Sequence, residues 1–144
     1  MKDNSLTLLR KISKFYDELI RSLAYSYDLN SNDIKVCSFL MNNPSLDSAK
    51  HIVELRMLPK SNVSSSVDKL VVNGYLSKRV DELDHRQHHL ALTEKAKPLC
   101  VKIDALNQYF FACLYDGIDD DLLKIQAQIN DQMIANIDRA RKEF

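Results

Sequence analysis

The amino-acid sequence predicts a mainly α-helical fold with one small β-hairpin. Glycine and proline, which interrupt helices, number only two and three in 144 residues. Apolar residues recur at steps of three and four along most of the chain, as they do on the buried stripe of a helix. The exception is the stretch from Tyr75 to Leu92, where two short strand-like runs flank a polar segment.

The composition predicts a single folded domain that is large enough to bury a core, with 45% hydrophobic and 28% charged residues. No stretch is long and apolar enough for a membrane span or a signal peptide, so a cytoplasmic protein without membrane contact is expected. The sequence contains no phosphate-binding loop, GxSxG, HExxH or dinucleotide fingerprint. We therefore expect neither an enzyme nor a cofactor.

Three helices are predicted before residue 59. The first covers residues 5–27, and its broad apolar stripe suggests contact with two neighbours. A second runs to about Met41, with Asn30 or Ser31 as its N-cap. A third, short helix covers residues 45–55 and is expected to bury Ala49, Ile52, Val53 and Leu55.

A fourth helix is predicted from Lys60 to Val72, where Val63, Val67, Leu70 and Val71 form one apolar stripe. The opposite face carries small or polar residues, namely Ser61, Asn62, Ser65 and Lys69, with Ser64 and Asp68 on its flank. Small hydroxyl and amide side chains allow close approach to another surface and offer donors and acceptors to base edges. This face therefore suggests a DNA-reading helix.

Asn73-Gly74 should end this helix, because glycine readily takes the left-handed conformation. Two strands follow, residues 75–80 and 88–92, and the polar segment 81–87 between them should form a projecting tip. A short helix, a tight turn, a polar-faced helix and a hairpin together have the layout of a winged helix-turn-helix.

After the hairpin, Thr93 can cap a fifth helix that runs to about Tyr115, with a bend or late start expected at Pro98. Asp116-Gly117 should end it. Three aspartates, residues 119–121, then favour the start of a last helix. That helix carries an apolar stripe made of Leu122, Ile125, Ile129, Met133 and Ile137. The two terminal helices have more apolar surface than a small winged helix can cover, which predicts burial against a second copy.

At several separated positions the sequence resembles the MarR family of bacterial transcription regulators. The matching elements are the Ser-rich helix from Val63 to Leu70, Gly74-Tyr75-Leu76, Asp84-His85-Arg86 and Leu90-Ala91-Leu92-Thr93. The resemblance implies a winged helix-turn-helix over residues 30–93, with residues 1–29 and 94–144 forming a dimerisation region. It further implies a homodimeric repressor of a pseudo-palindromic operator in double-stranded DNA, with a possible small-molecule effector whose site the sequence does not locate.

The resemblance also assigns site residues. Ser61, Asn62, Ser64, Ser65 and Lys69 should lie in the major groove, with Lys60 near phosphate. Arg86 should lie in or beside the minor groove, while Asp84 holds the wing by pairing with a basic neighbour. Secondary candidates for phosphate contact are Lys78, Arg79, His85 and Gln87. Many relatives have arginine where this chain has Ser65, so base reading should be lighter or differently placed here.

The charge distribution leaves one alternative open. The net charge is zero, but residues 55–80 carry five basic residues and one acidic residue, while residues 103–144 carry eight acidic and four basic residues. A basic middle suits a surface that faces phosphates. Net neutrality and the Ser65 departure instead favour a winged-helix dimer that binds a protein partner without specific DNA binding.

Two further features are ambiguous. The histidines at 85, 88 and 89 cluster in the hairpin, but neighbouring strand residues point to opposite faces, so no metal site is predicted. Cys37, Cys100 and Cys113 are odd in number and lack metal-ligand spacing. We expect buried packing for Cys37 and Cys113, and oxidant sensing is the alternative.

Overall fold

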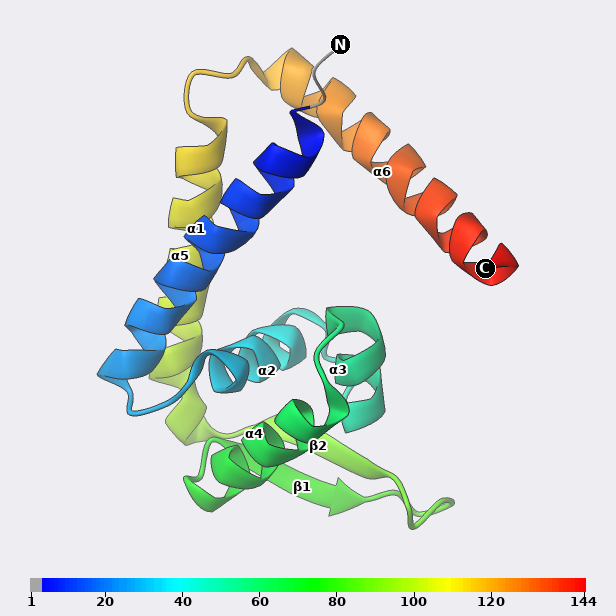
Figure 1. Ribbon diagram of the computed structural model, residues 1–144. Helices are drawn as coiled ribbons and strands as arrows, with labels where there is room; N and C mark the ends of the chain where they lie inside the picture. Colours follow the sequence, from blue (N-terminus) through cyan, green and yellow to red (C-terminus); the bar gives the residue numbers. More distant parts are fainter. Residues whose placement is uncertain (1–3) are drawn as a thin grey trace. The chain divides into compact units, whose positions relative to one another are not determined.

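The computed structural model describes residues 4–144, which form a mainly α-helical fold with one antiparallel hairpin (Figure 1). The elements are α1 (Ser5–Ser26), α2 (Ser31–Asn42), α3 (Ala49–Arg56), α4 (Lys60–Val72), β1 (Leu76–Val80), β2 (His88–Leu92), a 3₁₀ turn (Glu94–Ala96), α5 (Lys97–Tyr115) and α6 (Asp120–Glu143). The predicted fold class is confirmed. The chain divides into two compact units, one ending at Gln108 and the other covering Tyr109–Phe144.

The core of the first unit forms where α2 and α4 pack together, with α1, α3 and the hairpin around them. Most of these elements contribute one or two fully buried aliphatic side chains. The largest fully buried aliphatic side chains of the core, including two from the start of α5, are Ile20, Ile34, Val36, Ile52, Val63, Leu70, Leu99 and Ile103. Helix α4 contacts α2, α3 and β1, so its orientation is fixed from three sides. Burial of each such side chain stabilises the fold by roughly 1.5–3 kcal/mol.

The second helix begins with a capping box. Asn30 Oδ1 accepts a hydrogen bond from the Asp33 backbone N–H at 3.0 Å, and Asp33 Oδ2 accepts one from the Asn30 N–H at 2.8 Å. Of the two N-cap residues predicted, Asn30 is therefore the one used.

The third helix is shorter than predicted. It begins at Ala49 rather than at residue 45, because Ser48 Oγ accepts a hydrogen bond from the His51 N–H and caps it there. Ala49 and Leu55 were expected to be buried and are exposed. Only the narrow face around Ile52 reaches the neighbouring helices α2 and α4.

Helix α4 spans the predicted residues and ends as predicted at Gly74, whose φ is +81°. The Tyr75 N–H then donates to the Leu70 carbonyl, and β1 begins one residue later than expected, at Leu76. Strands β1 and β2 pair in antiparallel register, with Leu76 opposite Leu92 and Val80 opposite His88.

The segment after the hairpin fastens it to the end of α4. The Thr93 hydroxyl donates to the Gly74 carbonyl instead of capping a helix, and Lys95 Nζ donates to the Asn73 carbonyl at 2.6 Å. The chain first makes the 3₁₀ turn, and α5 begins only at Lys97. The late start expected beside Pro98 is therefore confirmed.

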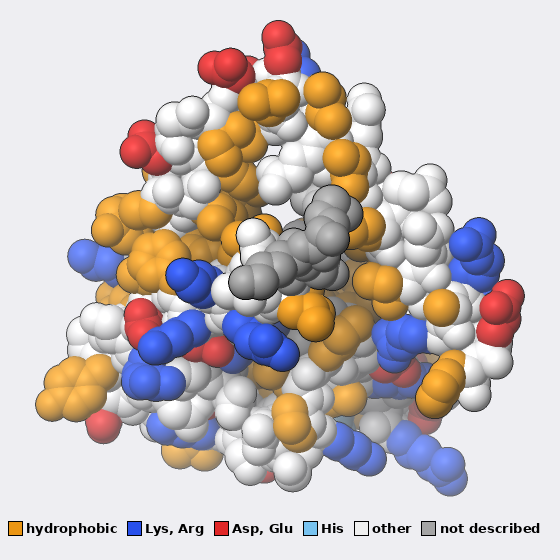
Figure 2. Space-filling view, turned by 45° about the horizontal axis from the view of Figure 1, so that its top comes forward, with side chains coloured by type: hydrophobic (Ala, Val, Ile, Leu, Met, Phe, Trp, Pro, Cys, Tyr) orange, Lys and Arg blue, Asp and Glu red, His pale blue; other side chains and the backbone are white. Residues whose placement is uncertain are grey.

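The second unit contains the end of α5, a turn at Gly117 and helix α6. Gly117 has a φ of +75°, and α6 starts after Asp119 with two more aspartates in its first turn, as predicted. The predicted stripe of α6 is exposed at all five positions, which are Leu122, Ile125, Ile129, Met133 and Ile137. Exposed hydrophobic side chains are also prominent on the face seen in Figure 2. Within residues 4–144, no helix has the length and apolar character that crossing a membrane requires.

Candidate nucleic-acid interface

Helix α4 presents a small, polar outer face because its apolar face is buried in the core. Val63, Val67 and Leu70 are buried, as the sequence predicts, and Ser66 is buried beside them, which it does not predict. The predicted reading residues that are exposed on α4 are Lys60, Ser61, Asn62, Ser64 and Ser65. Because these side chains are mostly short, the helix backbone can approach another surface closely.

Lys69 differs from the other predicted contact residues on α4. Its Nζ lies 3.1 Å from Asp33 Oδ2, at the capping box of α2. The Asp33 side chain is 0% exposed and the Lys69 side chain 39%. A buried carboxylate requires a compensating charge or hydrogen bonds, so this ammonium group stabilises the contact between α2 and α4.

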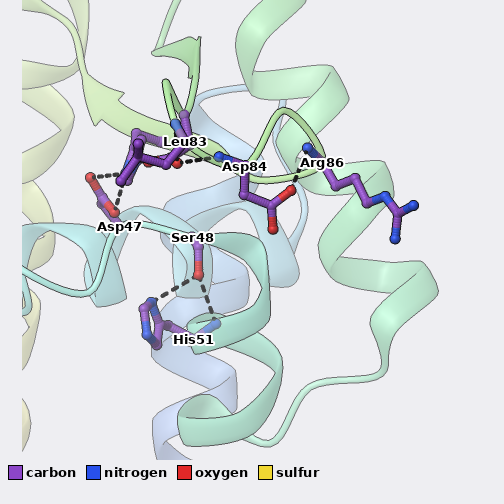
Figure 3. Close-up of polar contacts among 8 residues, drawn as sticks. Asp47, Ser48, His51, Leu83, Asp84 and Arg86 are labelled. Carbon is purple, nitrogen blue, oxygen red and sulfur yellow. Dashed lines mark hydrogen bonds and ion pairs between the residues drawn. The ribbon is translucent and has the colours of Figure 1, made fainter.

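The tip of the hairpin is organised by two aspartates. Asp81 Oδ2 accepts hydrogen bonds from the backbone N–H groups of Leu83 and Asp84, at 3.0 and 2.8 Å. Asp84 Oδ1 accepts one from the Arg86 N–H at 3.0 Å. Asp84 was expected to hold the wing by pairing with a basic neighbour, but its carboxylate bonds the backbone of Arg86 instead. The Arg86 side chain extends away from these contacts (Figure 3).

The helix and the hairpin together border one crevice. Its volume is about 540 Å³, and it lies between α3, α4 and the hairpin. Apolar residues such as Val53, Val67 and Leu90 line it. Five predicted contact residues also line it, namely Lys60, Ser64, Lys78, Arg86 and Gln87. The crevice lining therefore includes four cationic side chains from α3, α4 and the hairpin, of which Lys60, Lys78 and Arg86 are predicted contact residues and Lys50 is not. It also includes the carboxylates of Glu54 and Asp68.

The remaining predicted contact residues lie outside this crevice. Ser61, Asn62 and Ser65 are on the exposed face of α4, and His85 is exposed at the hairpin tip. Crevice and helix face are continuous along α4, because Lys60 and Ser64 belong to the exposed part of the same helix.

The structure also contains a polar cluster that the sequence does not single out. The ring of His89 lies between the carboxylates of Asp47 and Asp81. Asp47 is 42 positions away from His89 in the sequence, so no local motif could reveal this contact. In the part of the chain that the structure describes, no group of three His, Cys, Asp or Glu side chains could hold a metal ion.

The cysteines occupy different environments. Cys37 is buried, and burial, followed by the nearby Cys100 and Asp33, raises the pKa of its thiol to about 12. Burial likewise raises the pKa of Cys100. A raised pKa keeps a thiol protonated and unreactive at neutral pH. Cys113, which was expected to be buried, is exposed in the second unit.

Comparison with known proteins shows which family the chain resembles. Residues 27–87 match the model of the MarR family, and they include α2, α3, α4, β1 and the hairpin tip. Over this stretch, which is less than half of the chain, the sequence is similar to the MarR family. Among curated proteins, none matches the sequence.

Solved structures share this MarR fold along nearly the whole chain. A MarR protein from Peptoclostridium difficile has 16% identity and a TM-score of 0.83, with 96% of this chain and 90% of that chain covered. A MarR-family transcriptional regulator from Listeria monocytogenes, complexed with a 26mer DNA, has 19% identity and a TM-score of 0.81, covering 95% and 90%. A mutant MarR from E. coli, complexed with operator DNA, has 16% identity and a TM-score of 0.68, covering 92% and 98%.

Replacing Lys69 with methionine should destabilise the protein, because the buried Asp33 carboxylate loses its cation. Since Lys69 is partly exposed, we expect a loss of roughly 1–3 kcal/mol in the free energy of unfolding. Urea unfolding followed by circular dichroism measures this loss. The matched control is Lys60→Met on the same helix, which should change the free energy by less than about 0.5 kcal/mol. Equal unfolding midpoints for the two variants would show that the Lys69–Asp33 pair contributes no net stability.

Proposed function

We propose that this MarR-like chain is a sequence-specific DNA-binding transcription regulator that binds a pseudo-palindromic operator as a homodimer. The observation that carries the proposal is the crevice beside α4, where Lys60, Lys78 and Arg86 meet next to an exposed helix face of small polar residues. Cations from two elements that border one groove suit a phosphate backbone running between helix and wing.

The proposed binding mode assigns a role to each part of the interface. Ser61, Asn62 and Ser65 on α4 contact base edges in the major groove, since their short side chains let the helix enter it. Ser64 lies in the major groove beside them. Lys60, Lys78, His85 and Gln87 contact phosphates, and Arg86 enters the minor groove at the tip of the hairpin. The similar structures from Listeria monocytogenes and E. coli, which contain a 26mer DNA and operator DNA, support DNA binding by this fold.

The proposed homodimer provides two reading helices. They must lie about one turn of DNA apart, roughly 34 Å, to enter successive major grooves. The exposed stripe of α6 supports a partner surface, because five large apolar side chains at helical spacing are costly to leave in water. A second copy would cover them.

In the cell, we propose that the dimer acts in the cytoplasm as a repressor and that a small-molecule effector releases it. Such an effector can act only if it binds the DNA-competent and DNA-incompetent conformations with different affinities. The alternative function is a winged-helix dimer that binds a protein partner. It is favoured by the zero net charge and by Ser65 in place of a base-reading arginine.

The proposal predicts that the purified protein enriches an inverted repeat from a pool of random DNA duplexes. Affinity for the enriched duplex should fall steeply with salt, because phosphate contacts release counterions. A dimer that makes about six to ten such contacts loses roughly 10³-fold or more between about 50 and 200 mM salt. Selection followed by sequencing, and then fluorescence anisotropy across the salt range, measures both. Absence of enrichment by an intact dimer, or weak and salt-insensitive binding, would favour the protein-interaction alternative.

Replacing Arg86 with alanine should weaken operator binding by about 1–3 kcal/mol per protomer and should lower the salt slope by about one per protomer. The reason is that Arg86 lines the crevice and its side chain extends away from the hydrogen bonds at the hairpin tip (Figure 3). Anisotropy titrations at several salt concentrations measure both effects. Arg139→Ala on α6 removes the same charge outside the proposed interface and should leave affinity unchanged. Equal affinities of Arg86→Ala and wild type would remove Arg86 from the interface.

Replacing Ile129 with glutamate should convert the dimer to a monomer, because a charge on the α6 stripe opposes burial. Ile129 is 53% exposed in the isolated chain. Sedimentation velocity measures the molecular mass. Leu83→Glu makes the same type of change at the hairpin tip, where the side chain is 98% exposed, and this variant should remain dimeric. A dimeric Ile129→Glu variant would place the subunit interface elsewhere.

A further inference from the structure

The ring of His89 bridges two carboxylates that come from different segments. Its Nδ1 lies 2.9 and 3.0 Å from the two carboxylate oxygens of Asp47, in the turn before α3. Its Nε2 lies 2.7 Å from Asp81 Oδ1, at the start of the hairpin tip. The three side chains are 28%, 31% and 26% exposed, so solvent screens them only in part. Figure 3 shows Asp47 facing this cluster from the turn before α3.

This geometry is fully satisfied only by the protonated ring. A neutral imidazole has one N–H donor and one lone pair, whereas the imidazolium has two N–H donors. Both ring nitrogens of His89 face carboxylate oxygens at hydrogen-bonding distance. In the neutral form, one lone pair would face an anionic oxygen at under 3 Å and repel it.

The bridge lies at the base of the network that shapes the wing tip. Asp81 uses one carboxylate oxygen for His89 and the other for the backbone N–H groups of Leu83 and Asp84. Asp84 in turn accepts from the backbone N–H of Arg86. A continuous series of hydrogen bonds therefore leads from the His89 ring to the backbone of Arg86.

The other end of the bridge is anchored in the helical part of the same unit. The Asp47 carbonyl accepts a hydrogen bond from the Leu90 N–H at 2.8 Å, and Leu90 is buried in the core. The next residue, Ser48, caps α3. Asp47 is thus a fixed point against which the hairpin tip can be held.

We propose that His89 is a positioning residue for DNA binding: its protonated ring braces the hairpin tip against the turn before α3, keeps Arg86 in place, and loosens the wing when it loses its proton. This inference rests on the proposed function, because it concerns the proposed DNA contact of Arg86. It makes operator affinity depend on pH through a residue that does not itself touch DNA.

The charged groups around His89 set the pH range. Hydrogen bonding to Asp81 and then to Asp47 raises the pKa of His89 above its ordinary 6.5, while partial burial and Arg79, its partner across the strands, act in the opposite direction. The hydrogen bond from His89, helped by the backbone of Asp84, lowers the pKa of Asp81 from 3.8 to about 2.

The sign of the pH effect follows from these two directions. A raised pKa of His89 means that the stabilisation from its two hydrogen bonds to carboxylates is complete below 6.5. It is lost as pH rises through the higher pKa that His89 has in the folded protein. A lowered pKa of Asp81 means that the stabilisation from its carboxylate is complete above 3.8 and is lost only as pH falls toward 2. Between 3.8 and 6.5 both conditions hold, so the loss relevant to a working regulator occurs on the alkaline side of 6.5.

The test measures the Kd of the purified protein for its selected operator duplex between about pH 6 and pH 9 at constant ionic strength. Wild type should lose roughly three- to tenfold more affinity over this range than His89→Gln, whose amide keeps polarity but cannot become a cation. Both proteins retain His85 and His88, so any contribution of these two side chains cancels in the comparison. Parallel profiles for wild type and His89→Gln would overturn the proposal.

A second measurement needs no DNA and therefore separates this proposal from the proposed function. Nitrogen chemical shifts of the His89 ring report its protonation directly, and amide exchange at Leu83, Asp84 and Arg86 reports the order of the tip. We expect a ring pKa above 6.5 and faster tip exchange once the ring is neutral. If the wild-type protein binds no duplex at any pH, the proposed DNA-binding function is overturned, but the proposed role of His89 in ordering the hairpin tip is not. The proposed role of His89 would be overturned if its ring were neutral over the whole pH range. It would also be overturned if amide exchange at the tip did not change as the ring loses its proton.

Discussion

The packing of α4 against α2 determines how the rest of the proposed interface is placed. Val63, Val67 and Leu70 are buried along one side of α4, and the Lys69–Asp33 pair joins the same two helices. Each helical residue turns the side-chain direction by about 100°, so burial of this stripe fixes which residues point outward. Ser61, Asn62 and Ser65 are therefore exposed because of the core rather than because of any contact that they make.

The hairpin depends on the same helix. Gly74 turns the chain directly from α4 into β1, and the residues after β2 return to bond the Gly74 and Asn73 carbonyls. The end of α4 is thus held by the flanks of both strands. Since helix and hairpin cannot shift independently at this point, the backbone at the base of the crevice between them is held in place. A preformed surface of this kind loses little conformational freedom on binding.

Local signals predicted the fold well, and long-range contacts account for what the sequence missed. Helix α4 and its glycine stop follow from a periodic stripe and one residue type, which a sequence displays directly. The brace of His89 joins positions 42 residues apart, and nothing near either position marks the other. The inward direction of Lys69 is equally hidden, because a lysine at the edge of a polar helix face looks the same whether it meets a phosphate or a buried Asp33.

The network at the hairpin tip explains how acidic residues can lie beside a surface proposed to meet phosphates. Asp81 and Asp84 flank the predicted minor-groove residue Arg86, and bare carboxylates there would repel DNA. Each is instead bonded to positive or donor groups: Asp81 to the His89 ring and two N–H groups, Asp84 to the Arg86 N–H. The same bonds that reduce the repulsion also shape the tip. The positive charge on His89 therefore has two effects in the proposed complex. Its loss would release the hairpin tip and would leave the negative charge of Asp81 uncompensated next to DNA.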